Sequence, residues 1–321
     1  MRVGLDVSPL DQTRAGTARY LEQLRSLDAV EIVPLAFHGH RRAATLARDA
    51  YWYPFALPQL ARRAEIDVLH CPTFRGPLSS PVPLVVTVHD LAVLRHPETF
   101  NLWTRQYSRH CVPRVVRAAR RVIAVSEFTK RELVELLHAP EEKIRVVPNG
   151  VADVFASTGA RADGEYALAV GTLEPRKNLA RAREAARLAG VELRVVGDRG
   201  WGGVDVDGWA GRVSDEELAA LYRGARCLVY PSLYEGFGLP VVEAMACGTP
   251  VVTSAGGATE EVSGGAAVLV DPLDAGAIAA GIAEADRRRD ELVRLGLERA
   301  RAFDWDEVAR ATAAVYREAA G

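Results

Sequence analysis

The most informative stretch of the chain is residues 231–250, which read PSLYEGFGLPVVEAMACGTP. It follows the apolar run Cys227–Tyr230, which is typical of a buried strand. Pro240 suits the first turn of a helix, where no backbone N–H group is needed. Gly236 and Gly238 let the backbone approach a ligand closely. The stretch therefore predicts a strand, a glycine loop and a helix whose positive N-terminal end forms an anion site.

Two carboxylates bracket this loop. Glu235 precedes it, and Glu243 stands eight residues later, about one turn into the predicted helix. Gly248 is expected to end that helix as the residue after its C-cap. A capped helix beside a surface loop would also explain the glycines, but the pair of carboxylates favours a ligand site.

A second charged segment, residues 171–179, reads GTLEPRKNL and also stands between a predicted strand and a predicted helix. Adjacent Arg176 and Lys177 can hold a diphosphate there, the arginine as a planar fork and the lysine as a point charge. The chain has three lysines against 37 arginines, so a lysine at this position supports a specific role. We interpret the segment as a diphosphate clamp rather than a solvated basic loop.

Short Val- and Ile-rich runs alternate with amphipathic stretches along both halves of the chain. This alternation predicts parallel sheets with helices on both faces, and ligands at the carboxyl ends of the strands. The expected strands are 3–7, 31–35, 67–71, 84–88, 121–125, 144–147, 166–170, 192–196, 227–230, 250–253 and 266–270. The expected helices are 17–26, 102–119, 127–137, 179–188, 215–223, 240–247 and 305–319, and more than one helix fills 274–302.

The length of 321 residues suits two domains of about 150 residues each. The fold class expected is α/β, with two Rossmann-like, doubly wound domains that face a central cleft. We assign residues 1–160 to the first domain, 161–303 to the second and 304–321 to a C-terminal helix. The small, polar segment 156–165 is the predicted linker.

Composition excludes several classes of protein. Hydrophobic residues make up 49% of the chain, which argues against disorder, and no apolar run is long enough to span a bilayer. Four scattered cysteines without a CxxC pair disfavour a disulfide framework or a structural zinc. The N-terminus reads as a strand rather than a signal peptide, so a cytoplasmic location is expected.

Charge is distributed unevenly, with a net +5 over residues 1–160 and −7 over residues 161–321. The aromatic run 51–55 (YWYPF) is interpreted as core packing, with contact to an anionic membrane as the alternative. In that alternative the protein lies peripherally at the inner membrane face. Arg287, Arg288 and Arg289 are read as a solvated helix face, so no nucleic-acid partner is expected.

Four motifs stand out along the chain: the Glu235–Glu243 pair, residues 171–178 (GTLEPRKN), residues 125–128 (VSEF) and residues 147–151 (VPNGV). Together they resemble glycosyltransferase family 4. The resemblance covers nearly the whole chain. It implies a GT-B fold and a retaining, metal-independent transferase that uses a nucleotide sugar. The first domain would bind the acceptor and the second the donor, and the last helix would pack back on the first domain.

The resemblance also implies roles for residues of the second domain. Glu243 would bind the ribose hydroxyls of the nucleotide, and Glu235 would contact the transferred sugar. Arg176 and Lys177 would neutralise the leaving diphosphate. The backbone groups expected to hold the sugar, the phosphate and the base are those of Gly236, Phe237, Gly238, Leu239, Arg212 and Val213. Ser214 and Glu217 also fit a capping box.

Three residues of the first domain are further candidates. His89 ends an apolar strand, and the resemblance places it beside the transferred sugar. Asp90 would orient the His89 ring, hold a hydroxyl or cap a turn. Gly16 is what this chain keeps of the family's glycine loop, which contacts phosphate or acceptor. Asp205-Val206-Asp207 reads as a solvated loop, so neither a metal nor another cofactor is expected.

The segment 89–98 resembles family members that transfer mannose. GDP-mannose is therefore the first candidate for the donor, and UDP-sugars are the alternative. The acceptor would carry a hydroxyl group, as in a glycan, a lipid-linked saccharide or a secondary metabolite. No enzymic nucleophile is evident, which favours front-face transfer.

A nucleotide-sugar 2-epimerase and a non-catalytic nucleotide-binding module remain rival functions. A nicotinamide oxidoreductase is disfavoured because no GxGxxG opens a helix after the first strand.

Overall fold

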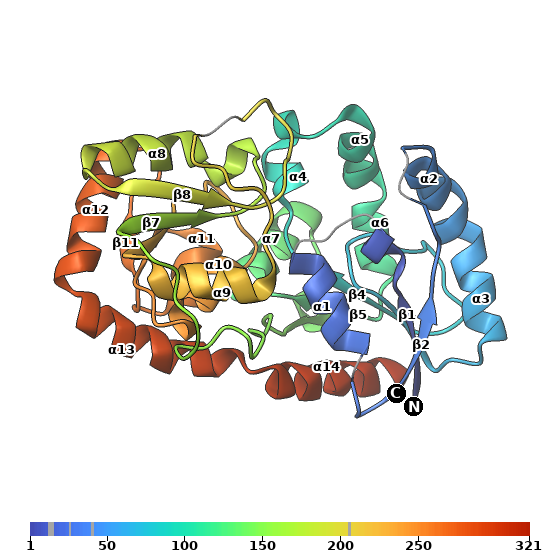
Figure 1. Cartoon of the computed structure of the whole chain (residues 1–321). Helices are drawn as coiled ribbons and strands as arrows, with labels where there is room; N and C mark the ends of the chain where they lie inside the picture. Colours follow the sequence, from blue (N-terminus) through green and yellow to red (C-terminus); the bar gives the residue numbers. More distant parts are fainter. Residues whose placement is uncertain (12–15, 26, 40–41, 205–206) are drawn as a thin grey trace. The chain divides into compact units, whose positions relative to one another are not determined.

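The computed structural model describes residues 1–11, 16–25, 27–39, 42–204 and 207–321 (Figure 1). The chain forms two compact units, one from Met1–Gly150 with Trp305–Gly321 and the other from Val151–Asp304. Each unit contains one sheet in which every strand pair is parallel. The predicted α/β class, with two doubly wound parallel sheets, is confirmed.

The sheet of the first unit has the strand order β2-β1-β3-β4-β5-β6. Its strands are β1 (Arg2–Asp6), β2 (Glu31–Leu35), β3 (Val68–Cys71), β4 (Leu84–Val88), β5 (Arg121–Ala124) and β6 (Ile144–Val146). The helices are η1 (Ser8–Asp11), α1 (Gly16–Arg25), α2 (Arg42–Ala47), the π-helix η2 (Arg48–Ala56), α3 (Leu57–Arg63), α4 (Ala92–Arg95), η3 (Pro97–Thr99), α5 (Leu102–His110), α6 (Val112–Ala118), α7 (Glu127–Leu137), η4 (Glu141–Lys143) and α14 (Trp305–Ala320). Because the strand order reverses between β1 and β3, their carboxyl ends flank a switch point, where doubly wound sheets bind ligands.

The sheet of the second unit has the strand order β11-β10-β9-β7-β8. Its strands are β7 (Tyr166–Val170), β8 (Glu192–Val196), β9 (Cys227–Tyr230), β10 (Val251–Ser254) and β11 (Val268–Val270). The helices are η5 (Pro175–Lys177), α8 (Leu179–Leu188), α9 (Asp215–Gly224), α10 (Leu239–Ala246), α11 (Gly257–Ser263), α12 (Ala275–Arg287), α13 (Arg289–Ala300) and η6 (Arg301–Phe303). The corresponding switch point lies between β7 and β9.

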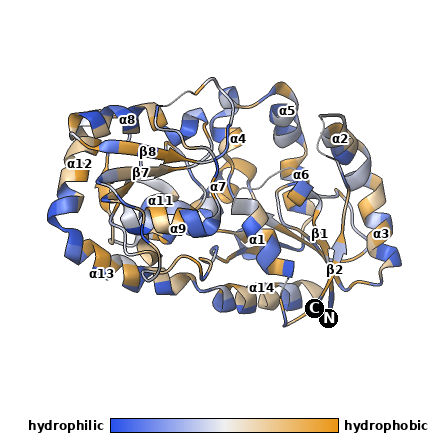
Figure 2. Ribbon diagram, viewed as in Figure 1, coloured by the Kyte–Doolittle hydropathy of each residue, from blue (hydrophilic) through white to orange (hydrophobic). Residues whose placement is uncertain are grey.

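The apolar strand sequences account for this arrangement. All five residues of β4 and all five of β7 are buried, as expected of strands covered on both faces. The helices instead carry both hydrophobic and hydrophilic residues (Figure 2), because each covers its sheet with one face and meets water with the other. The predicted strands agree with the structure to within two residues at each end.

Helix α14 packs on the sheet of the first unit (Figure 1), where Val308, Val315 and Ala319 join the core of β1 and β4 residues. Its Tyr316 hydroxyl lies 2.7 Å from His70 Nδ1, and His70 Nε2 lies 2.9 Å from Thr87 Oγ1. Both His70 and Tyr316 are fully buried, and burial, followed by the charge of His89, lowers the pKa of His70 to about 3. A neutral histidine therefore ties this helix to the sheet.

Several helices differ from the sequence-based expectation. The single helix predicted over 102–119 is two helices, α5 and α6, with a break at Cys111 just before Pro113, whose ring cannot continue a helical hydrogen-bond ladder. The segment 42–63, where no helix was predicted, is helical throughout. Short helices α4 and α11 were also missed.

The division between the units differs from the expected boundary at residue 160, because residues 151–160 group with the second unit. The Arg223 side chain donates hydrogen bonds to the carbonyls of Ala156, at 2.9 Å, and Ala160, at 2.5 Å. The Ala162 N–H group donates to Ala220 O at 3.0 Å. The segment read as a linker is therefore fastened to helix α9 of the second unit.

Candidate functional site

Three charged side chains of the second unit, those of Arg176, Lys177 and Glu235, meet at the β7/β9 switch point. Lys177 and Arg176 come from η5, soon after β7, and Glu235 follows β9. Lys177 Nζ lies 2.6 Å from Glu235 Oε1, and Arg176 Nη1 lies 3.0 Å from Glu235 Oε2. The Tyr230 hydroxyl, at the end of β9, accepts from Lys177 and donates to Glu235, both at 2.8 Å. The structure thus brings together three of the predicted site residues.

This cluster is nearly closed to solvent, with 10% of the Lys177 side chain and 9% of the Glu235 side chain exposed. Burial opposes ionisation of Glu235, but the charges of Lys177 and Arg176, aided by the Lys177 hydrogen bond, lower its pKa to about 2. Glu174, which is 2% exposed, pairs with Arg176 Nη2 at 2.7 Å. The two cations are therefore balanced by two carboxylates, a pairing that was not foreseen from the sequence.

Glu243 has a hydrogen-bond partner outside this cluster. It is buried on α10 and accepts a hydrogen bond of 3.0 Å from the Tyr222 hydroxyl of α9. The loop before it is shaped by Gly238, whose φ of 103° is unfavourable for a residue with a side chain. Helix α10 begins at Leu239 and ends before Gly248, whose φ of 72° confirms the expected end.

The remaining candidates of the second unit divide into core and surface positions. Phe237 is buried, with its ring edge-to-face against Phe303 at 5.5 Å between centroids. The Arg212 side chain is exposed and pairs with Asp198 at 3.3 Å, while Val213 is half-buried. The capping box predicted at Ser214 and Glu217 is confirmed at the start of α9. Gly236 lies between Glu235 and Phe237 in the loop.

In the first unit, His89 follows β4 and packs edge-to-face on Tyr20 at 4.9 Å between ring centroids. Its Nε2 atom lies 3.0 Å from Pro72 O, so Nε2 carries the proton and Nδ1 is the acceptor of a neutral ring. Burial lowers the pKa of His89, against the opposing effects of Asp90 and of the Pro72 hydrogen bond. The ring can accept a hydrogen bond from a hydroxyl group.

Asp90 acts as a cap, because its Oδ1 accepts a 3.0 Å hydrogen bond from the Ala92 N–H group at the start of α4. Of its three predicted roles, the structure shows the turn cap. Gly16 begins α1, and the preceding residues 12–15, which include the rest of the predicted loop, lie outside the described part of the chain.

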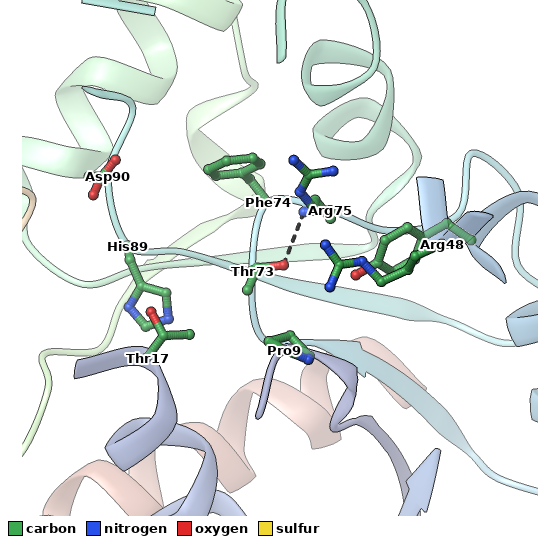
Figure 3. Close-up of a pocket in the computed structure, with 9 residues that line it drawn as sticks. Pro9, Thr17, Arg48, Thr73, Phe74, Arg75, His89 and Asp90 are labelled. Atoms are coloured by element: carbon green, nitrogen blue, oxygen red, sulfur yellow. Dashed lines mark hydrogen bonds between the residues drawn. The ribbon is translucent and has the colours of Figure 1, made fainter. Parts of the chain in front are cut away.

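His89 and Asp90 border a cavity of about 310 Å³ at the carboxyl end of the first sheet (Figure 3). Its walls come from segments after β1, β3 and β4 and from helices α1 and η2: Pro9, Thr17, Arg48, Tyr53, Thr73, Phe74, Arg75, His89 and Asp90. Sequence reasoning missed Arg48, Arg75 and Thr73. Thr73 and Arg75 follow β3 directly, so their strand-end position was a usable signal. Arg48 gave none.

The aromatic run 51–55 is divided in the structure. Trp52 and Tyr53 are buried in the core, as interpreted, whereas Tyr51 and Phe55 are each 58% exposed. None of the described helices is both long enough and apolar enough to cross a membrane. Among the described residues, no three His, Cys, Asp or Glu side chains are arranged to hold a metal ion. Asp205 and Val206 of the DxD-like segment lie outside them.

Two family models match the chain almost end to end. "Glycosyltransferase Family 4" matches residues 8–154, and "Glycosyl transferases group 1" matches residues 152–298. The boundary between the two models falls close to the boundary between the two structural units.

Curated relatives and solved structures agree with these models. The chain is 34% identical to O-antigen chain mannosyltransferase B of Escherichia coli, over 73% of this chain and 70% of that protein. It is 33% identical to the MMP alpha-(1→4)-mannosyltransferase of Mycolicibacterium hassiacum, over 80% and 72% of the two chains. Among solved structures, Anabaena HepE in complex with UDP-glucose superposes with a TM-score of 0.76 at 19% identity, over 98% of both chains.

Proposed function

The chain belongs to glycosyltransferase family 4, and we propose that it moves a hexose from a nucleoside-diphosphate sugar to a hydroxyl group of an acceptor, with retention of anomeric configuration. The family models, the relatives and the shared fold establish the GT-B glycosyltransferase class. The donor, the stereochemistry and the acceptor are the proposed part. In this proposal the second unit holds the donor and the first unit the acceptor.

The observation that carries the proposal is the cluster of Arg176, Lys177 and Glu235 at the β7/β9 switch point. As the bond from the anomeric carbon to the diphosphate breaks, negative charge grows on the diphosphate oxygens. A buried guanidinium and ammonium group are suited to stabilise that charge. The surrounding protein weakens the attraction between these cations and the diphosphate less than water would. Glu235, which stays ionised beside them, orients both cations and can accept a hydrogen bond from a sugar hydroxyl.

The acceptor hydroxyl must lose a proton during transfer. We propose front-face transfer, in which the departing phosphate oxygen takes that proton while the new glycosidic bond forms on the same face. The neutral ring of His89, with Nδ1 as an acceptor, would bind a hydroxyl of the transferred sugar. No residue of the protein forms a covalent bond in this scheme, and no metal ion is required.

GDP-mannose is the donor we propose. Both relatives described above carry mannosyltransferase in their names, which supports mannose. The likeness to HepE, whose structure holds UDP-glucose, keeps UDP-sugars as the alternative.

A donor screen tests this choice. The purified protein is incubated with GDP-mannose, GDP-glucose, UDP-glucose, UDP-galactose and UDP-N-acetylglucosamine, and release of the nucleoside diphosphate is measured with and without simple glycoside acceptors. We expect release from GDP-mannose above all others. Turnover restricted to a UDP-sugar would refute the mannose assignment, and an inverted anomeric proton coupling in the product by NMR would refute retention.

The same incubations separate the rivals. A 2-epimerase would convert the donor sugar without an acceptor, which chromatography of the recovered sugar would reveal. A non-catalytic module would bind the nucleotide in calorimetry but turn over none of the donors.

We also propose that the exposed rings of Tyr51 and Phe55 contact an anionic membrane. Their centroids lie 6.5 Å apart, and Arg62 and Arg63 on the adjoining α3 are exposed. Such a mixture of exposed rings and arginines is typical of peripheral membrane contact. Sedimentation with phosphatidylglycerol vesicles is expected to pull down the wild-type protein and to lose the Tyr51→Ser/Phe55→Ser variant. Equal sedimentation of the two proteins would refute the contact.

A further inference from the structure

The cavity at the β1/β3 switch point of the first unit contains a buried arginine, Arg48, that no described residue neutralises by direct contact. Arg48 is 3% exposed, yet its guanidinium makes no hydrogen bond and no ion pair with any residue in the described part of the chain. The guanidinium lies over the face of Tyr53, with 5.9 Å between Arg48 Cζ and the ring centroid. A buried charge without a paired partner is costly, and a bound anion would offset that cost.

The other arginine of the cavity is different. Arg75 pairs with both carboxylate oxygens of Asp49, and Asp49 also accepts a hydrogen bond of 2.9 Å from Trp103 Nε1. Arg75 further lies over the ring of Tyr107, with 4.5 Å between Cζ and the centroid. These contacts hold Arg75 in place and neutralise it, so the positive charge available on the cavity wall is that of Arg48.

Asp6 is the nearest candidate for an internal counter-charge. It is fully buried, and its Oδ1 accepts hydrogen bonds from the backbone and the hydroxyl of Ser8. Burial raises the pKa of the Asp6 carboxyl, although the Ser8 hydrogen bonds, the charge of Arg48 and the nearby Tyr53 hydroxyl act in the opposite direction. No hydrogen bond joins Asp6 to Arg48 among the described residues, and both Asp6 Oδ2 and Arg48 Nε are buried without a partner. Asp6 therefore influences Arg48 from a distance without occupying its donors.

The geometry around Arg48 favours an anion in the cavity. Figure 3 shows the guanidinium turned from η2 toward Thr73 and Pro9. Thr73 Oγ1 accepts a 3.3 Å hydrogen bond from the Arg75 N–H group, so its own proton is available to donate. The guanidinium of Arg48 and the hydroxyl of Thr73 thus offer hydrogen-bond donors to the cavity, and His89 also lines it.

We propose that this cavity selects an acceptor that carries an anionic group, a carboxylate or a phosphate, and that Arg48 and Thr73 bind that group. The inference rests on the proposed function, because it places the acceptor in the first unit. A planar guanidinium fork matches the oxygen spacing of either anion. The volume of about 310 Å³ lies in the range of small-ligand pockets and suits one charged sugar residue.

Direct binding provides the test, independent of turnover. Glucose 6-phosphate, glucuronate and glucose are titrated calorimetrically into the wild-type protein and into the Arg48→Met and Arg117→Met variants. Arg117 is an exposed arginine of α6 and is the matched control. We expect one or both charged sugars to bind at least about tenfold more tightly than glucose, since charge-assisted hydrogen bonds are worth that much. Arg48→Met should abolish this preference, and Arg117→Met should keep it.

The outcomes separate the sources of the anion and the two proposals. A preference for glucose 6-phosphate alone points to a phosphorylated acceptor, and a preference for glucuronate alone to a uronic acid. If Arg48→Met unfolds, Thr73→Val replaces it and should reduce the preference while leaving the circular dichroism spectrum unchanged. Equal affinity for all three sugars, or a preference retained by the variants of the cavity, overturns the inference. Charged-sugar binding without any donor turnover would support the anion site and refute the proposed transferase reaction instead.

Discussion

The two switch points of this molecule carry similar charges and treat them differently. At the β7/β9 switch point, Lys177 and Arg176 are each paired with a carboxylate. At the β1/β3 switch point, Arg75 is paired with Asp49, but Arg48 has no direct counter-ion among the described residues. A paired cluster is ordered before a ligand arrives, so it can serve any donor with the same leaving group. An unpaired cation gains its counter-ion only when an anionic ligand binds. It therefore favours anionic ligands over neutral ones.

The largest effect is expected from removing the lysine of the paired cluster. Lys177→Ala leaves the buried Glu235 with one cation, Arg176, besides the Tyr230 hydroxyl, and removes a cation from the place where leaving-group charge develops. We expect kcat for donor turnover to fall by about 10²–10³ and nucleotide binding to weaken. The control is Lys130→Ala, because Lys130 pairs with Glu141 at the surface, at 2.8 Å. A Lys177→Ala enzyme with the wild-type rate would contradict the assignment of this site.

The second prediction contrasts the two arginines of the first unit. Arg75→Met strands the Asp49 carboxylate, whose side chain is 1% exposed, and is expected to cost about 3–5 kcal/mol in unfolding free energy. Arg48→Met removes a charge that has no direct partner among the described residues, and should cost less than half as much. Urea unfolding followed by tryptophan fluorescence measures both. Equal losses would show that Asp6 stabilises Arg48 as strongly as Asp49 stabilises Arg75.

The third prediction concerns acid. The Glu235 carboxyl has its pKa lowered from 4.5 to about 2 in the folded protein. Its ion pairs therefore stabilise the fold fully above pH 4.5, and this stabilisation is lost as the pH falls toward 2. Thermal melts between these limits should show a steeper decline of Tm for the wild-type protein than for Glu235→Gln. Parallel curves would indicate that Glu235 is not held in ionised form by the two cations.

The smallest effect is expected at Arg212, whose side chain is 43% exposed and faces an equally exposed Asp198. Because base recognition is assigned to main-chain groups there, Arg212→Ala should leave nucleotide affinity within about twofold and change stability by less than about 1 kcal/mol. Calorimetry with GDP and a thermal melt check both expectations. A tenfold loss of affinity would instead show that the Arg212 guanidinium recognises the base or the phosphate.

Sequence reasoning succeeded where local patterns are decisive. Short runs rich in β-branched residues, such as Leu84–Val88, favour strands covered on both faces, and Pro240 with Gly248 marked the ends of α10 closely. The proximity of Lys177 and Glu235 also followed, because both stand after neighbouring parallel strands.

The failures have physical reasons as well. Residues 48–56 form a π-helix with Pro54 inside it, a conformation that propensities do not predict, and this hid the element that carries Arg48. Pairing of Arg176 with Glu174 depends on side-chain directions that spacing does not fix. The same limit applies to the aromatic run, where Trp52 is buried and its neighbour Tyr51 is exposed.

Helix α14 makes the first unit discontinuous in sequence, since residues 305–321 complete a unit whose sheet lies entirely within residues 1–150. At translation rates of about 5–20 residues per second, the first unit waits about 10–30 s while the intervening second unit is made. During that interval the surface that later buries Val308, Val315 and Tyr316 is uncovered. The order of synthesis thus favours folding of the second unit first, and damage to the C-terminal helix would impair the N-terminal sheet.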